Sequence, residues 1–268
     1  MLLLFFSCKE KHEVKTAVAE PAVALKSIEA GTKMIFINGG NYLPFYGSDT
    51  VLIKVAPFLL DEKPVTNEEF LEFVKANPQW RKSNVKRLFA DTTYLRDWPS
   101  DLQYAADQKP DAPVCFVSWF AAKAFAESTG KRLPTLDEWE FVAMADEKDF
   151  NARGKKSYSN NIVNLYLKKN RQFQPVKSSH PNAWGVYNMF DLIWEWTDDF
   201  NSVLTTGDSR EGVFDDKNLF CAGAATSATD VLNYAAFMRF GLRASLKADY
   251  TVSNLGFRCA KDTLIQSL

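Results

Sequence analysis

The sequence is poor in the residues that build common metal centres. Only two histidines occur among 268 residues, His12 and His180, which excludes a zinc or non-haem iron site built on several imidazoles. No apolar run approaches the roughly 18 residues that span a bilayer, so an integral membrane protein is not expected. Neither sign of charge is in excess, since 32 Lys and Arg oppose 33 Asp and Glu. A strongly electrostatic nucleic-acid partner is therefore excluded.

Apolar and aromatic residues, in contrast, are plentiful. Hydrophobic residues make up 46% of the chain and aromatic residues 14%. This content excludes disorder of the whole chain, and the length suffices for one large domain or two small ones with a substantial core. Because no internal repeat and no later linker occurs, we expect a single domain over residues 34–262.

The four cysteines, Cys8, Cys115, Cys221 and Cys259, have different surroundings. No two form a Cys-x-x-Cys pair, so no disulfide framework is predicted. Cys115 and Cys259 lie in apolar segments, where cysteine usually acts as a small buried hydrophobe.

The first eight residues look like a shortened bacterial lipoprotein signal. An apolar stretch and Ser7 precede Cys8, and charged residues follow it, which is the order of a lipobox whose cysteine becomes lipid-modified. We expect residues 1–8 to be a truncated lipoprotein signal and residues 9–33 a flexible tether. The predicted location is the bacterial cell envelope, lipid-anchored and extracytoplasmic, either periplasmic or at the outer membrane. The alternative interpretation is a hydrophobic N-terminus without this role.

Local signals predict several elements of the domain. Thr66 with Glu69, and Thr135 with Glu138, have the spacing of capping boxes that begin helices. A third helix is predicted from Ser118 to Thr129, before a glycine that favours the left-handed conformation. A strand is expected over residues 34–37, and the remainder is short apolar segments between turns. These signals predict an α+β domain with much irregular backbone.

Seven motifs follow one another in a distinctive order. They are Phe58–Asp61 with Pro64–Phe70, Pro113–Trp119, Gly130–Thr135, Asp137–Glu140, Pro181–Met189, Trp194–Trp196 and Asn254–Ala260. In this order and spacing they resemble the formylglycine-generating enzyme family, also called the sulfatase-modifying-factor domain. The resemblance implies that family's α+β fold, which is related to the C-type-lectin-like fold.

The copper site of the family is not matched. Formylglycine-generating enzymes oxidise a sulfatase cysteine with oxygen and a copper(I) ion, which is held by two cysteines five positions apart. Soft thiolates suit copper(I), but the matching positions here are Asp230 and Ala235. No cysteine lies between Cys221 and Cys259. The resemblance therefore implies a divergent member for which copper is not expected.

A calcium site of the family is matched more closely. The resemblance implies ligation by the side chains of Asn188 and Glu195 and by the carbonyls of Asp191 and Ile193. Such mixed oxygen donors suit calcium, although Asp191 stands where the family has glycine. The alternative is that Asn188 and Glu195 only brace the turn.

Three functions are weighed from these features. We expect first a lipid-anchored binding or accessory (maturation) factor without copper, with a protein or peptide partner in the envelope. The second is a formylglycine-generating-type oxidoreductase that acts on a protein or small molecule through a non-standard site. Its candidate catalytic residues are Cys221, Asp230, Tyr234 and Arg239. The third, a carbohydrate-binding lectin-like module, is suggested by fold analogy alone.

Overall fold

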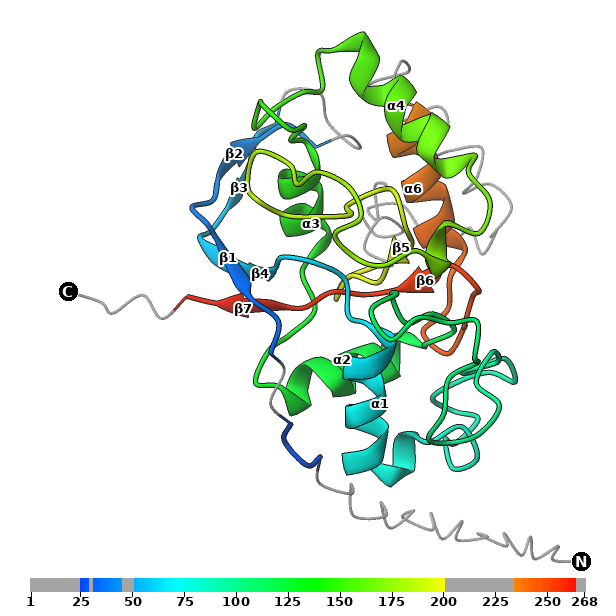
Figure 1. The fold of residues 1–268 in the computed structure, drawn as a ribbon. Helices are drawn as coiled ribbons and strands as arrows, with labels where there is room; N and C mark the ends of the chain where they lie inside the picture. Colours follow the sequence, from blue (N-terminus) through cyan, green and yellow to red (C-terminus); the bar gives the residue numbers. More distant parts are fainter. Residues whose placement is uncertain (1–24, 29–30, 45–50, 201–233, 264–268) are drawn as a thin grey trace, which may run out of the picture.

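The computed structural model describes residues 25–28, 31–44, 51–200 and 234–263. Helices and short strands alternate with long irregular segments (Figure 1), which confirms the predicted α+β class. Within these described ranges, no helix combines the length and the apolar character that crossing a bilayer requires. The lipobox residue Cys8 lies outside them.

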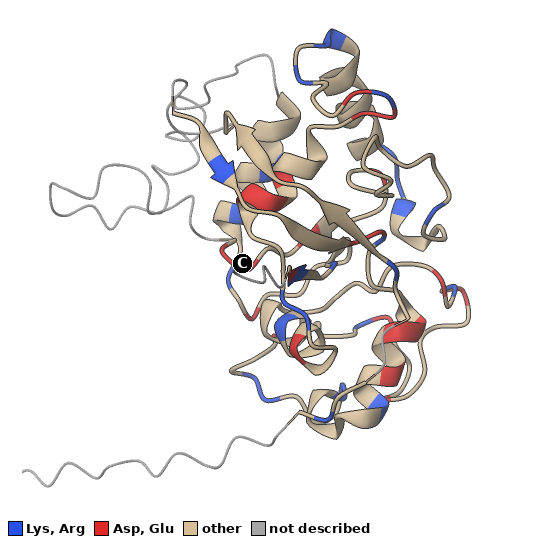
Figure 2. Ribbon diagram, turned by 90° about the vertical axis from the view of Figure 1, so that its left-hand side faces the viewer, with Lys and Arg blue, Asp and Glu red and all other residues tan. Residues whose placement is uncertain are grey.

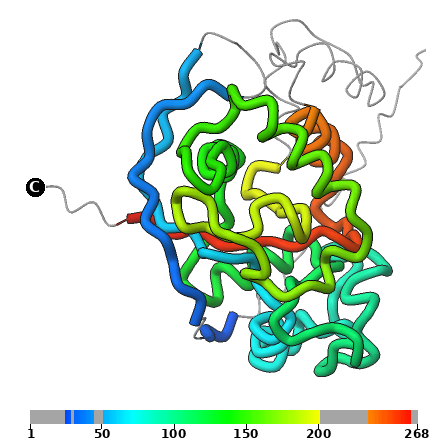
Figure 3. Tube along the Cα trace, turned by 45° about the horizontal axis from the view of Figure 1, so that its top comes forward, coloured from blue at the N-terminus to red at the C-terminus, as the bar shows by residue number. Residues whose placement is uncertain are grey.

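The two ends of the domain pair in one small sheet. Strands β1 (Met34–Ile37), β4 (Phe58–Asp61) and β7 (Ala260–Asp262) are antiparallel in the order β1-β4-β7. Phe58 lies opposite Ile37 on one side and opposite Asp262 on the other. The chain therefore closes on itself at this sheet, with β4 between the first and last strands, and Figure 3 shows the blue start and the red end of the domain meeting there.

The domain contains two further pairs of strands. Strands β2 (Gly40–Tyr42) and β3 (Ile53–Val55) form an antiparallel pair, whereas β5 (Trp194–Glu195) and β6 (Leu255–Gly256) are parallel. Gly256 allows a close approach at the second pair, because a Cβ there would lie 2.3 Å from the carbonyl oxygen of Val114.

Three helices begin where the sequence predicts. Thr66 and Thr135 form complete capping boxes at the starts of α1 (Asn67–Ala76) and α3 (Leu136–Ala143). Ser118 caps α2 (Trp119–Ser128), which ends before Gly130, at a φ of +66°.

Two longer helices were not predicted. They are α4 (Lys156–Tyr166) and α6 (Tyr234–Ser245), and they pack against each other. Lys155 precedes α4 without a side-chain cap, so the sequence carries no start signal there. Short 3₁₀ helices, η1 and η2, occur at Pro78–Trp80 and Arg171–Phe173.

Two apolar clusters form most of the core. One joins α1 and α2 to the strand β6, through rings such as Phe70, Phe125 and Phe257. The other lies between α3 and the strands β1 to β4, and includes Trp139 and Leu60. Burial of these aromatic side chains supplies most of the driving force for folding.

The end of the expected tether is packed on the domain. Leu25 and Ile28 contact the first cluster, and the backbone of Lys26 forms hydrogen bonds in both directions with the side chain of Asn77. The backbone N–H of Ile28 donates to the carbonyl of Ser128. The packed body therefore includes residues before Met34.

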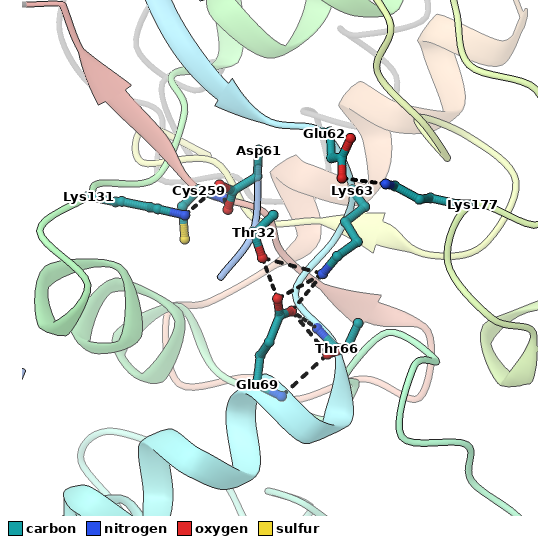
Figure 4. Close-up of polar contacts among 9 residues, drawn as sticks. All are labelled: Thr32, Asp61, Glu62, Lys63, Thr66, Glu69, Lys131, Lys177 and Cys259. Carbon is teal, nitrogen blue, oxygen red and sulfur yellow. Dashed lines mark hydrogen bonds and ion pairs between the residues drawn. The ribbon is translucent and has the colours of Figure 1, made fainter. Parts of the chain in front are cut away.

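The junction between β4 and α1 is held by buried and partly buried charges (Figure 4). Lys63 pairs with Glu69 at 2.8 Å, so that the capping box of α1 also carries an ion pair. Asp61 accepts from Lys131 at 2.6 Å and from the backbone N–H of Cys259 at 3.0 Å. The bonds of Asp61 tie the end of β4 to the segment that enters β7.

Candidate functional site

A buried carboxylate with two arginines joins α3 to α6. Glu140 lies on α3, while Arg239 and Arg243 lie one turn apart on α6, so their side chains share one face of that helix. Arg239 donates to Glu140 through Nε at 3.0 Å and Nη2 at 2.7 Å, and Arg243 donates through Nη1 at 2.7 Å. Both guanidinium groups also lie over the ring of Trp139.

The charges of this triad stabilise one another. Burial by itself raises the pKa of Glu140, but the two guanidinium groups outweigh it and lower the pKa below its usual value. The triad therefore carries one net positive charge in the interior, and Arg239 is only 1% exposed.

The four predicted catalytic residues are not brought together among the described residues. Cys221 and Asp230 lie outside those residues. Tyr234 is 56% exposed at the start of α6 and stacks on Phe237, whereas Arg239 points into the core toward Glu140. The catalytic role of these four residues stays a prediction.

Glu195 belongs to a second buried ion pair. Its two carboxylate oxygens accept from Nε and Nη2 of Arg258, each at 2.8 Å, and one of them also accepts from the indole N–H of Trp139. Arg258 donates further to the backbone carbonyls of Tyr187 and Asn188. The arginine of the closing motif therefore neutralises the glutamate of the Trp-Glu-Trp motif.

The side chains predicted to hold calcium are engaged with other groups of the protein. Asn188, at a φ of 55°, accepts from the backbone N–H of Lys177 and donates to both carboxylate oxygens of Asp191. These two side chains line one cavity, whereas Glu195 and Ile193 line another. Within the described ranges, no three His, Cys, Asp or Glu side chains are grouped to hold a metal. Because Arg258 already neutralises Glu195, this arrangement favours the bracing role, and calcium ligation by these residues stays a prediction.

The two described cysteines are unsuited to thiolate chemistry. Cys115 and Cys259 are free thiols buried in the core. Burial raises the pKa of both thiols well above the usual value, and nearby carboxylates, Asp97 and Asp61 respectively, raise it further.

A groove of about 460 Å³ is the feature that sequence reasoning missed. It lies between α4, residues 145–147 and the loop of residues 179–191. Figure 1 shows α4 next to α6 at one end of the molecule. His180, predicted as a loop residue, lies on its wall and is exposed. A polar row at helical spacing, Ser157, Asn161 and Asn164, is the one signal in the sequence that points to it.

The fold and these buried pairs define a class of protein. It is an α+β domain in which Arg258 of the closing motif pairs with Glu195 of the Trp-Glu-Trp motif. Comparison with known proteins shows which family this is. The profile of the sulfatase-modifying factor enzyme 1-like domain matches residues 21–263. The chain belongs to this family, as the motifs predict.

Curated relatives include both enzymes and a protein named as inactive. The formylglycine-generating enzyme of Streptomyces coelicolor is 29% identical over 80% of this chain and 81% of its own length. The Bos taurus enzyme of the same name is 31% identical over 87% and 75% of the two chains. The Bos taurus protein named "Inactive C-alpha-formylglycine-generating enzyme 2" is 29% identical over 78% of each.

Proposed function

We propose that this chain is a lipid-anchored, extracytoplasmic binding or accessory factor that works without copper. The observation that carries the proposal is the absence of cysteine between Cys221 and Cys259, where the family's enzymes need a pair. The two described thiols, of Cys115 and Cys259, are buried, and burial raises the pKa of both. A relative of similar identity is named as inactive, so loss of the oxidase activity is compatible with this domain.

The oxidoreductase alternative rests on the two relatives named as formylglycine-generating enzymes. Against it stands the placement of Arg239, because a guanidinium that is paired with Glu140 and almost fully buried does not reach a substrate. The binding role is therefore the one that the described geometry favours.

An oxidase assay distinguishes the two. Residues 21–268, which contain the family match, are loaded with copper(I) and given a cysteine-containing sulfatase-type peptide under oxygen. The Streptomyces coelicolor relative serves as positive control, and the same peptide with serine in place of cysteine as negative control. We expect no tight copper binding and no aldehyde in the peptide by mass spectrometry. Aldehyde formation that disappears in Cys221→Ser would overturn the proposal and establish a one-cysteine site.

The anchor is tested separately in living bacteria. The chain is expressed behind a complete bacterial signal segment that ends at Cys8, with an alkyne fatty acid in the medium. We expect labelling in membrane fractions that is lost in Cys8→Ser and kept in the matched variant Cys221→Ser. A soluble, unlabelled wild-type chain would refute the anchored location.

A further inference from the structure

The groove beside α4 is lined by one row of polar side chains from that helix. Ser157, Asn161 and Asn164 follow the spacing i, i+4 and i+7, so they lie along one face of α4, and Lys168 lines the groove just after the helix ends. Tyr158, Ile162 and Leu165 of the same helix line the groove as well, and the first two also pack in an apolar cluster with Ala235 of α6. The helix therefore turns a row of small hydrogen-bonding groups into the groove.

These groups are unused by the described part of the protein. The side chains of Asn161, Asn164 and His180 have no hydrogen-bond partner among the described residues. Other amides of the groove are occupied: Asn182 donates to the carbonyl of Val142 and accepts from backbone N–H groups. Amide and imidazole groups each donate and accept, so the free set suits a ligand whose own groups do both.

The charge of the groove excludes anionic ligands. It contains no arginine, and the acids Asp146, Glu147 and Asp191 outnumber its one lysine, Lys168. Two of these acids are already occupied, because Asp146 pairs with Lys155 and Asp191 accepts from Asn188. Lys155 neutralises Asp146, and Lys168 offsets one of the other two acids, so the lining keeps one net negative charge. This charge disfavours an anion and is too small to define a site for a polycation, so a neutral ligand is favoured.

We propose that this groove binds a neutral polyhydroxylated ligand, a mono- or disaccharide unit of a carbohydrate. Each sugar hydroxyl can both donate and accept a hydrogen bond, so it can pair with either the donor or the acceptor atoms of Asn161, Asn164 and His180. The volume of about 460 Å³ lies in the range of about 300–1,000 Å³ that is typical of small-molecule sites. The inference deepens the proposed binding role and rests on it.

Two neighbouring asparagines make a matched test. Asn161 lines the groove, whereas Asn160, also exposed and on the same helix, does not. Residues 21–268 are titrated with maltose, cellobiose, lactose and N,N′-diacetylchitobiose, and binding is followed by saturation-transfer NMR, with spermidine as a cationic competitor. We expect transfer to at least one disaccharide, an affinity about threefold to tenfold weaker in Asn161→Ala and in Asn164→Ala, and no change in Asn160→Ala.

Several results would overturn the inference. One is the absence of saturation transfer to all four sugars. Others are an Asn160→Ala variant whose sugar affinity falls as much as that of the groove variants, or groove variants that bind as tightly as the wild type. Displacement of the sugar by spermidine would show that the site binds cations. Circular dichroism of each variant checks that the fold is kept. Failure here is distinguishable from failure of the proposed function, because the oxidase and anchor assays do not involve the groove.

Discussion

Replacing Glu140 by glutamine tests the buried triad directly. Glutamine keeps the shape of the side chain, but it removes the negative charge between Arg239 and Arg243 and replaces one accepting oxygen by an amide group that only donates. Glu140 and Arg239 are each 1% exposed, so water cannot take over the role of the carboxylate. Breaking a buried ion pair by removing one partner costs about 3–5 kcal/mol.

This loss is large relative to the stability of a domain. Typical unfolding free energies are about 5–15 kcal/mol, so Glu140→Gln is expected to lose a large part of the total. For a chain of this size, about 2–4 °C of melting temperature is lost per kcal/mol, which gives a decrease of about 10 °C. Urea unfolding at neutral pH, followed by tryptophan fluorescence, measures both the midpoint and the slope.

Glu72 provides the matched control. It pairs with Lys75 on the surface of α1, where both side chains are about half exposed, at 55% and 44%. The variant Glu72→Gln is expected to lose less than about 1 kcal/mol, because exposed pairs are screened by water and salt. If Glu140→Gln loses no more than this control, the triad does not stabilise the fold and the reasoning is refuted.

The remaining predictions concern acid, backbone crowding and calcium. The folded-state pKa of Glu140 and of Asp91 is lowered, so each carboxylate stabilises the fold above its usual pKa near 4, and this stability is lost as the pH falls further. The urea midpoint, measured from about pH 7 to about pH 2, should therefore decrease once the pH is below about 4. A constant midpoint would contradict this. Gly256→Ala should destabilise the domain by several kcal/mol in the same assay, because its Cβ meets the Val114 carbonyl, whereas Gly154→Ala, with open space around it, should not. Calcium should leave the melting temperature unchanged, since Arg258 already neutralises Glu195; a rise of several degrees on adding calcium, reversed by EDTA, would show that the turn rearranges into a ligand set.

Local physical chemistry made much of the fold predictable. The capping boxes at Thr66 and Thr135 involve atoms three residues apart, so the sequence alone contains the whole interaction. Cys115 and Cys259 could be assigned to the core from their apolar neighbours. The order and spacing of the seven motifs indicate the family from the sequence alone.

The roles of charged residues were harder to predict, because their partners are distant in sequence. Arg239 reaches Glu140 across 99 positions, and Arg258 reaches Glu195 across 63. The sequence shows only that a residue is an arginine or a glutamate, and not whether its side chain contacts a substrate, a metal or an ion-pair partner.

The sequence by itself determined the class of this protein: its α+β signals, its family motifs and the absence of the copper cysteines are all properties of order and spacing. Only the tertiary structure decided that Glu195 meets an arginine, that Arg239 is buried, and that Asn161 and Asn164 face a groove. The physical reason is that burial and pairing depend on which elements pack together, and α3, α6 and the closing strand meet only when the whole chain has folded.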